Sequence, residues 1–284
     1  MSRKSRDNQR DLLFQSEYQE TIKLNEKEAE EFAMKVEIQI DEGLIKYSNG
    51  DFINLLVAGL GANRGVIRRK FSRALGLIGE KAIPALVNAL HNNQDVITRR
   101  AAAKTLRIIK SPTSLPYLLK ALNNDPDTVV QGSAAAAMAV FGEEAVDLLL
   151  TVLSNPESTA TQSGLASWGI AFIGAKGHKK ILKATLSKNR HVRMAAISAL
   201  GDQINSLADK EAKHILSNAL NDSCPEVRTE ATILIGQLTK REWSESLLLE
   251  KLNDLNNEVR KSTALTLMKT NSDYALPNLK NKLK

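Results

Sequence analysis

The stretch Val66–Gly79, VIRRKFSRALGLIG, returns with changes along the chain and decides the fold. Its further copies begin at Ile97, Val129, Thr161, His191, Glu226 and Glu258. One position of the repeat is occupied by Arg68, Arg99, Gln131, Ser163, Arg193, Arg228 and Arg260, in steps of 31, 32, 32, 30, 35 and 32 residues. We refer to this position as the column. A period in this range is typical of a repeat array, in which neighbouring units cover each other's apolar faces.

A second apolar segment precedes each copy, as AIPALVNALHNN precedes the copy at Ile97. Its apolar residues recur at intervals of three and four, which is the buried stripe of an amphipathic helix. Loops rich in Asn, Asp and Pro, such as NNDPD at 123–127, separate the two segments. Each repeat is therefore predicted to be a pair of helices, A and then B. The predicted fold class is all-α, a right-handed α-solenoid of seven to eight pairs with helix B on the concave side.

The repeats resemble HEAT-like repeats. The resemblance is carried by Pro84 and Pro116 near the start of helix A and by the pattern V-R-x-x-A-x-x-x-[LI]-G in helix B. Aspartates in the loops between helices belong to the same pattern, at Asp95, Asp127 and Asp222. The resemblance covers about residues 51–284.

Residues 1–50 differ from the rest in charge, because they hold 8 Lys and Arg against 11 Asp and Glu, a net of −3, whereas the whole chain carries +7. We expect 1–50 to form a helical cap or a partner-binding arm, with about the first ten residues disordered and helices at Asp11–Lys23 and Asn25–Ile45. Residues 51–284 are expected to form the solenoid.

The composition excludes several kinds of site. The one cysteine, Cys224, cannot form an internal disulfide and suits a reducing compartment, and no apolar run approaches the ~20 residues that span a bilayer. The N-terminal stretch MSRKSRDNQRD contains no apolar h-region, so we expect no secretory signal and a cytoplasmic protein. The four histidines occur in no metal-binding spacing, and no phosphate loop or nucleophile motif is present. We therefore expect no metal and no cofactor, and no catalytic group can be named.

Two rows of helix B, one and five residues after the column, are predicted to face the concave side. In the first repeats these rows hold the cations Arg69, Arg73, Arg100 and Lys104. The next repeats hold Gly132, Ala136, Gly164 and Trp168. The two glycines leave room either for a ligand or for tight helix packing. Trp168 is expected to be exposed, unless the frame is shifted by one residue and the ring is buried. The column arginines Arg68, Arg193, Arg228 and Arg260 are expected to bond loop aspartates.

Such a surface would suit a flat, largely apolar ligand with acidic groups. Trp168 could stack on the ligand, the small residues could admit it, and the cations could bind its carboxylates.

Among HEAT-like proteins, the chain resembles the phycobilisome lyase family, the E/F-type phycobilin lyases. The resemblance is carried by VIRRKFSRALGLIGEKAIPALVNAL, TRRAAAKTLRII, NNDPDTVVQGSAAAAM and the ASWGIAFIGA block around Trp168. It implies a phycobilin substrate that is attached by a thioether to a cysteine of a phycobiliprotein subunit. Some members of the family work as two-chain pairs, and others remove bilins. Seven repeats in one chain favour a single-chain member, such as one that serves phycoerythrin.

Two other classes of function remain open. One is a scaffold or phycobilisome degradation factor that binds phycobiliproteins. The other is a nucleic-acid-binding repeat protein, which the pI of 9.4 permits but the modest charge excess and the acidic N-terminus disfavour. We expect no nucleic-acid partner and no membrane span.

Overall fold

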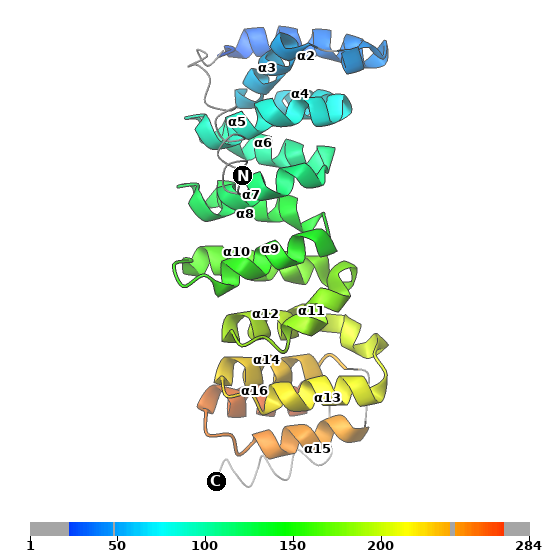
Figure 1. The fold of residues 1–284 in the computed structure, drawn as a ribbon, viewed down its shortest axis with the longest axis vertical. Helices are drawn as coiled ribbons and strands as arrows, with labels where there is room; N and C mark the ends of the chain where they lie inside the picture. Colours follow the sequence, from blue (N-terminus) through cyan, green and yellow to red (C-terminus); the bar gives the residue numbers. More distant parts are fainter. Residues whose placement is uncertain (1–22, 48, 239–241, 270–284) are drawn as a thin grey trace, which may run out of the picture. The chain divides into compact units, whose positions relative to one another are not determined.

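The computed structural model is all-α over the residues it describes, 23–47, 49–238 and 242–269, where no strand occurs (Figure 1). The chain divides into two compact units, residues 1–102 and 103–284, which are described separately. The predicted disordered start and the helix at Asp11–Lys23 fall almost wholly on residues 1–22, outside the described residues. The proposed boundary at residue 50, the hand of the solenoid and its concave side stay predictions.

Unit 1 contains α2 (Glu26–Asp41), α3 (Gly50–Ala58), α4 (Gly65–Ile78), α5 (Ile83–Asn92) and the first half of α6 (Val96–Ile109). Unit 2 continues with α7 (Leu115–Asn124), α8 (Thr128–Ala139), α9 (Glu143–Ser154), α10 (Ala160–Ile173), α11 (His178–Ala184), α12 (Arg190–Leu200), α13 (Asp209–Leu220), α14 (Pro225–Ile235), α15 (Glu242–Lys251) and α16 (Asn257–Lys269). Short 3-10 helices lie at Leu44–Tyr47, Gly59–Gly61, Gly79–Ala82, Pro112–Ser114, Gly174–Gly177 and Gly201–Ser206.

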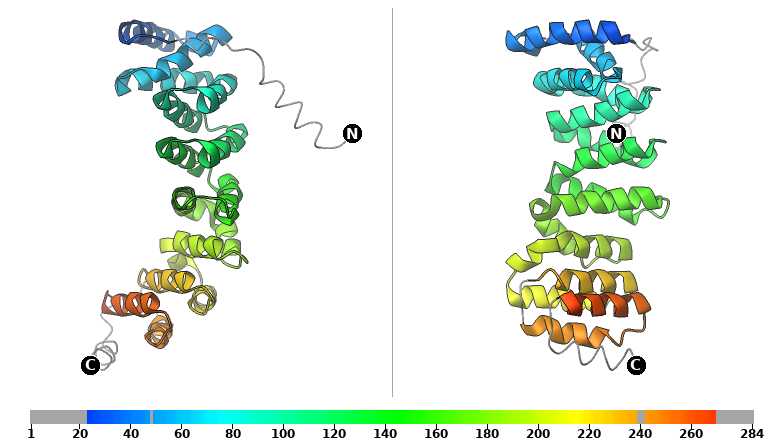
Figure 2. Two further views of the ribbon diagram at one scale, coloured as in Figure 1. Left: turned by 90° about the vertical axis from the view of Figure 1, so that its left-hand side faces the viewer. Right: turned by 180° about the vertical axis from the view of Figure 1, so that it is seen from behind.

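The predicted helix pairs are confirmed, and α4 coincides closely with the stretch that opens the repeat pattern. From α3 onwards the described helices alternate as A and B. In unit 2 the B helices α8, α10, α12, α14 and α16 pack on one another in order and form one layer. The A helices α7, α9, α11, α13 and α15 form the second layer (Figure 2). The core lies between the layers, where the apolar stripes meet.

In unit 1, α2 packs against α4. The ring of Phe32 on α2 stacks on Phe71 at a centroid distance of 5.4 Å and meets Phe52 edge-on at 5.6 Å. Glu37 of α2 accepts a 2.7 Å hydrogen bond from Lys70 of α4. Helix α2 begins after its cap Asn25 but ends at Asp41, before the predicted Ile45. The chain turns at Gly43, whose φ of +73° is a conformation that glycine adopts readily.

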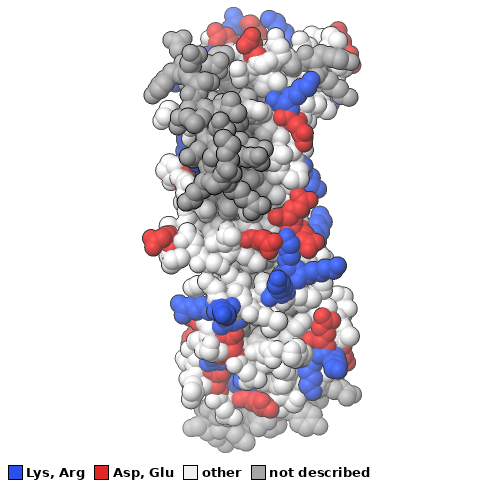
Figure 3. Space-filling model, viewed as in Figure 1, with Lys and Arg blue, Asp and Glu red and all other residues white. Residues whose placement is uncertain are grey.

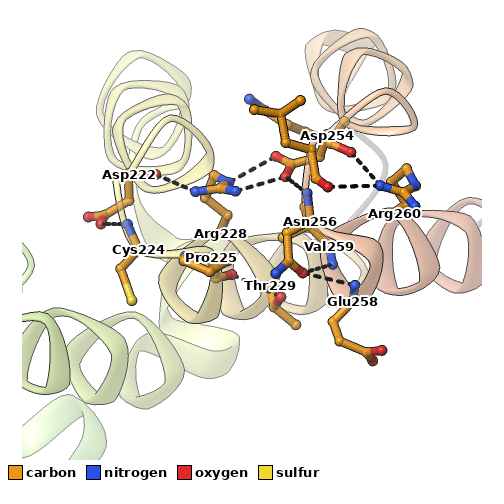
Figure 4. A network of polar contacts seen from close by, with 12 residues as sticks. Asp222, Cys224, Pro225, Arg228, Thr229, Asp254, Asn256, Glu258, Val259 and Arg260 are labelled. Carbon is orange, nitrogen blue, oxygen red and sulfur yellow. Dashed lines mark hydrogen bonds and ion pairs between the residues drawn. The ribbon is translucent and has the colours of Figure 1, made fainter.

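The column arginines bind the loop that precedes their own helix. Arg228 Nη1 donates to the carbonyls of Asp222 and Ser223, and Arg260 Nη1 donates to those of Asp254 and Leu255 (Figure 4). Arg68, Arg99 and Arg193 donate to the equivalent pairs of carbonyls in their own repeats. These carbonyls follow the end of helix A, where backbone acceptors lack helical partners.

Of the four arginines predicted to bond loop aspartates, Arg193 and Arg228 bond the aspartate carboxylate of the next repeat, which confirms the prediction for these two. Arg228 makes two bonds of 2.8 Å to Asp254 (Figure 4), and Arg193 makes bonds of 2.6 and 2.7 Å to Asp222. The hydrogen bonds from Arg228 hold the pKa of the Asp254 carboxyl below its ordinary value. We call these two pairs the arginine–aspartate ladder. It joins three successive repeats of unit 2.

The loop aspartates occupy two positions with different roles, which the sequence pattern does not separate. Asp222 and Asp254 lie six residues before the column and receive the arginine of the preceding repeat. Asp95 and Asp127 lie four residues before the column and cap helix B: Asp127 accepts from the backbone N–H groups of Val129 and Val130, both at 2.9 Å.

The ladder predicts a large effect on stability. Arg228→Ala leaves the nearly buried Asp254 carboxylate, 6% exposed, without its cation. The free energy of unfolding should fall by about 2–4 kcal/mol. Lys261→Ala is the matched control, because Lys261 forms an exposed ion pair with Glu258, and it should cost less than about 1 kcal/mol. Urea unfolding followed by circular dichroism measures both. Equal losses in the two variants would contradict the role of the ladder.

The positive φ angles of the residues that follow the B helices predict a stabilising substitution. Gly79, Gly142, Gly174 and Gly201 follow α4, α8, α10 and α12 with positive φ, whereas Lys110 follows α6 with a φ of +53°. A side chain is strained there, so Lys110→Gly should raise the free energy of unfolding by about 1 kcal/mol. Gly201→Ala is the reciprocal variant and should lower it by a similar amount, since a Cβ there meets nothing within 4 Å and only the backbone is strained. A destabilised Lys110→Gly protein would refute this.

Candidate functional site

The B-helix layer of unit 2 carries the second predicted row on its surface. Ala136 is half-buried, whereas Trp168, Ser198, Ile233 and Leu265 are exposed. These residues belong to the five successive B helices of unit 2, which pack on one another in the order α8, α10, α12, α14 and α16. We call this surface the B face. The predicted frame is therefore correct in unit 2, and a shift by one residue, which would bury Trp168, is wrong.

Trp168 is one member of an exposed aromatic pair. Its side chain is 47% exposed and stacks on Phe172, one turn further along α10, at a centroid distance of 5.5 Å and an interplanar angle of 28°. Phe172 is 61% exposed. Two large stacked rings on a solvent-facing helix surface offer a stacking face to a flat ligand.

The glycines beside this pair do not serve tight packing. A Cβ built at Gly164, one turn before Trp168, would meet no heavy atom within 4 Å. At Gly132 on α8 it would meet only Leu165, at the ordinary distance of 3.6 Å. The close approach occurs instead at Gly169, where a Cβ would lie 3.1 Å from Leu149. The packing interpretation of Gly164 is thus wrong, and the surface beside Trp168 is open there.

The predicted cations lie on α4 and α6. Arg69 and Arg73 are four residues apart on α4 of unit 1, are exposed, and form no ion pair with any described residue. Arg100 and Lys104 have the same spacing on α6. The Nε of Arg100 is buried and has no hydrogen-bond partner among the described residues. These cations fall in both units. That they form one bilin site with Trp168, Gly132, Ala136 and Gly164 stays a prediction.

A half-buried carboxyl group, Glu230, lies on α14. Burial raises the pKa of the Glu230 carboxyl, and the hydroxyl of Ser198 on α12 opposes this in part. Glu230 is in no ion pair of the described residues, which separates it from Asp222 and Asp254 in the ladder.

Sequence reasoning missed Phe172 and Glu230. The spacing of Trp168 and Phe172, four residues apart in helix B, was a usable signal for Phe172. No comparable signal marks Glu230, because its burial depends on how α14 packs against α12. The column position of α8 and α10 also differs from the arginine pattern: Gln131 donates to the carbonyl of Asp125, and the neighbour of Ser163, Gln162, donates to that of Asn123.

Other kinds of site find little support. No group of three or more His, Cys, Asp or Glu that could hold a metal ion occurs among the described residues. In the same part of the chain, no helix is long and apolar enough to cross a membrane. On the face of unit 2 in Figure 3, Lys and Arg alternate with Asp and Glu rather than forming the single-sign stripe that follows a phosphate backbone.

Comparisons with known proteins identify a repeat family and a relative of this chain. Residues 53–139 match the family model for HEAT repeats. The chain is 46% identical over 254 residues to the bilin biosynthesis protein MpeU of Synechococcus sp. strain WH8020, covering 88% of this chain and 86% of that protein.

Solved structures to which the chain is similar include the CpcE–CpcF complex of phycocyanin lyase from Nostoc sp. PCC7120, with 20% identity, a TM-score of 0.32, and coverage of 66% of this chain and 99% of that one. Human deoxyhypusine hydroxylase is similar over 86% of this chain and 96% of its own, with 17% identity and a TM-score of 0.32.

The raised pKa of Glu230 predicts a pH dependence of stability. The folded chain keeps this proton to a higher pH than the unfolded chain, in which a glutamate titrates near ~4.3. The stability that comes from this proton is complete below that value and is lost as pH rises through the folded pKa. Glu230→Gln, which stays neutral, should therefore lose less unfolding free energy than the parent as the pH rises above about 4. Urea unfolding at a series of pH values measures this, and identical slopes would count against the assignment.

Proposed function

The chain belongs to the HEAT-like repeat phycobilisome lyase family, the family of the bilin biosynthesis protein MpeU, and on that premise we propose that it binds a phycobilin on the B face and attaches it to a phycobiliprotein subunit. The observation that carries the site is the exposed Trp168–Phe172 pair beside the open surface at Gly164. A phycobilin is an open-chain tetrapyrrole, flat and largely apolar, with two propionates.

Stacking and apolar contact supply the affinity in this proposal. One face of the bilin lies against the Trp168 ring, and the missing side chains at Gly132 and Gly164 let it approach α8 and α10. Removal of apolar surface from water contributes ~25 cal/mol per Å², whereas an exposed ion pair contributes only ~0.2–1 kcal/mol. The cations Arg69, Arg73, Arg100 and Lys104, assigned from the sequence rows, therefore orient the propionates more than they hold the ligand.

The covalent step is an addition reaction. The acceptor cysteine belongs to the phycobiliprotein subunit, and its thiol adds across a carbon–carbon double bond of the bilin. A C–S bond forms, the π bond breaks, and the proton of the thiol ends on the bilin, so neither an oxidant nor a reductant is needed. A chain that positions bilin and thiol in contact supplies much of the rate by proximity, which agrees with the absence of a nucleophile motif.

The test uses the full chain, co-expressed with bilin-synthesis enzymes and candidate phycobiliprotein subunits, including phycoerythrin. Absorbance of the purified subunit under denaturing conditions reports covalent attachment. Trp168→Ala should lower attachment about 10-fold, the equivalent of ~1.4 kcal/mol of lost stacking and contact. Gly164→Leu should lower it similarly, because a Cβ at this position meets no heavy atom within 4 Å and the added side chain fills the open surface.

The control is Leu186→Ala, which also truncates an exposed apolar side chain, 74% exposed, but lies in the loop before α12. It should leave attachment unchanged. Circular dichroism checks that each variant is folded. If folded Trp168→Ala and folded Arg100→Ala/Lys104→Ala both attach bilin at the parent rate, the site assignment is wrong. Loss of pigment from an already coloured subunit, or stable association with no transfer, would contradict attachment as the function.

A further inference from the structure

A group of exposed lysines lies on the A layer of unit 2, at α11. Residues 158–201 contain 7 Lys and Arg and no Asp or Glu. Lys179 and Lys183 are four residues apart on α11, and Lys176 precedes Lys179 by three residues in the 3-10 turn before that helix. Residues with these spacings share one side of a helix. All three are exposed, and we call them the lysine face.

The lysine face does not help to stabilise the fold. Its three members form no ion pair with any described residue, whereas the neighbouring Lys180 binds Asp147 of α9 at 2.7 Å. Like charges one turn apart repel each other. Lys179 also lies in the first turn of α11, where the helix dipole disfavours a cation, while α9 and α13 begin with acids such as Glu143 and Asp209. The charges therefore call for a partner outside the described fold.

The lysine face begins close to the aromatic pair of the B face. Lys176 follows Phe172 by four residues, a length of chain that spans at most about 14 Å. The turn that holds Lys176 is packed in place, since a Cβ built at Gly142 would lie 3.2 Å from the Cβ of Lys176. A protein that reaches a bilin on Trp168 at this edge of unit 2 is therefore within reach of the lysines.

The charges around the lysine face favour a protein partner. Helix α9 packs against α11 and carries the exposed acids Glu143, Glu144 and Asp147. Figure 3 shows such neighbouring groups of opposite sign on the face that it draws. A nucleic-acid backbone is negative along its whole length and would be repelled by α9. A protein surface can place its acids opposite α11 and keep them away from α9.

We infer that the lysine face binds an acidic surface of the phycobiliprotein subunit that accepts the bilin. The inference rests on the proposed function and names the surface that recognises the second substrate. Charges at the rim of an interface act mainly on the rate of encounter and on its salt dependence. The lysines thus bring the acceptor subunit to the edge of the B face, whereas the bilin itself is held elsewhere, on Trp168.

The experiment measures attachment by the purified full chain, with phycobilin and the acceptor subunit found by the co-expression test. Lys179→Glu/Lys183→Glu should raise the KM for the subunit about 10-fold at low salt and leave kcat unchanged, since only the encounter is weakened. At about 0.5 M salt the difference should shrink to less than about 2-fold, because exposed charges are then screened. Affinity for free phycobilin, followed by bilin absorbance, should match the parent.

Lys210→Glu/Lys213→Glu is the matched control. It makes the same change of net charge at two exposed lysines of the next A helix, α13, and should raise the KM less than about 2-fold. An equal rise in both variants would reduce the effect to net charge and overturn the inference.

The remaining outcomes separate the inference from the proposed function. If the parent attaches bilin and the folded Lys179→Glu/Lys183→Glu protein has the parent KM, the inference fails while the proposed function stands. If the parent attaches bilin to no subunit, both fail. A loss of salt-dependent binding to a DNA duplex, with the KM unchanged, would assign the lysines to nucleic acid instead. Should circular dichroism show that the double variant does not fold, an unchanged KM at low salt in Lys179→Ala would overturn the inference by itself.

Discussion

The arginine–aspartate ladder is the contact on which the arrangement of the last three described repeats of unit 2 depends. Each ladder arginine serves two repeats at once, since it bonds carbonyls of the loop before its own helix and the aspartate of the following loop. That aspartate in turn accepts from a backbone N–H two residues on, as Asp222 does from Cys224 and Asp254 from Asn256. One side chain therefore sets the loop, the start of helix B and the spacing to the next repeat.

Because the ladder occupies the loops between helices A and B, it leaves the outer surface of the B helices free for other uses. Arg193 and Arg228 lie on the same helices as Ser198 and Ile233, which are exposed on the B face. The apolar core between the layers holds the helices in register, so the B face carries side chains that the fold does not need. The open surface at Gly164 and the stacked ring of Phe172 are examples. A glycine inside a helix costs ~1 kcal/mol relative to alanine, which a purely structural surface would avoid.

Periodicity sufficed to predict the helix pairs, the column and the exposure of Trp168, because each follows from which face of a helix a residue occupies. Periodicity did not show which side chains of neighbouring helices lie against each face. Gly164 and Gly169 are both glycines of α10, but only Gly169 meets a neighbouring side chain closely. In the same way, Asp222 and Asp127 look alike in the repeat pattern and differ in role by two residues of register. Glu230 was missed because its burial arises from packing between α12 and α14, which no single repeat records.

The central claim is that a bilin stacks on Trp168, and Trp168 fluorescence tests it most directly. The chain has 2 tryptophans, so Trp243→Phe leaves Trp168 as the only indole emitter. Stacking at contact distance should quench that emission almost completely and saturably as free phycobilin is added, with a midpoint equal to the one seen by bilin absorbance. Emission that stays unchanged while absorbance reports bound bilin would show that the ligand lies elsewhere, and would contradict the account.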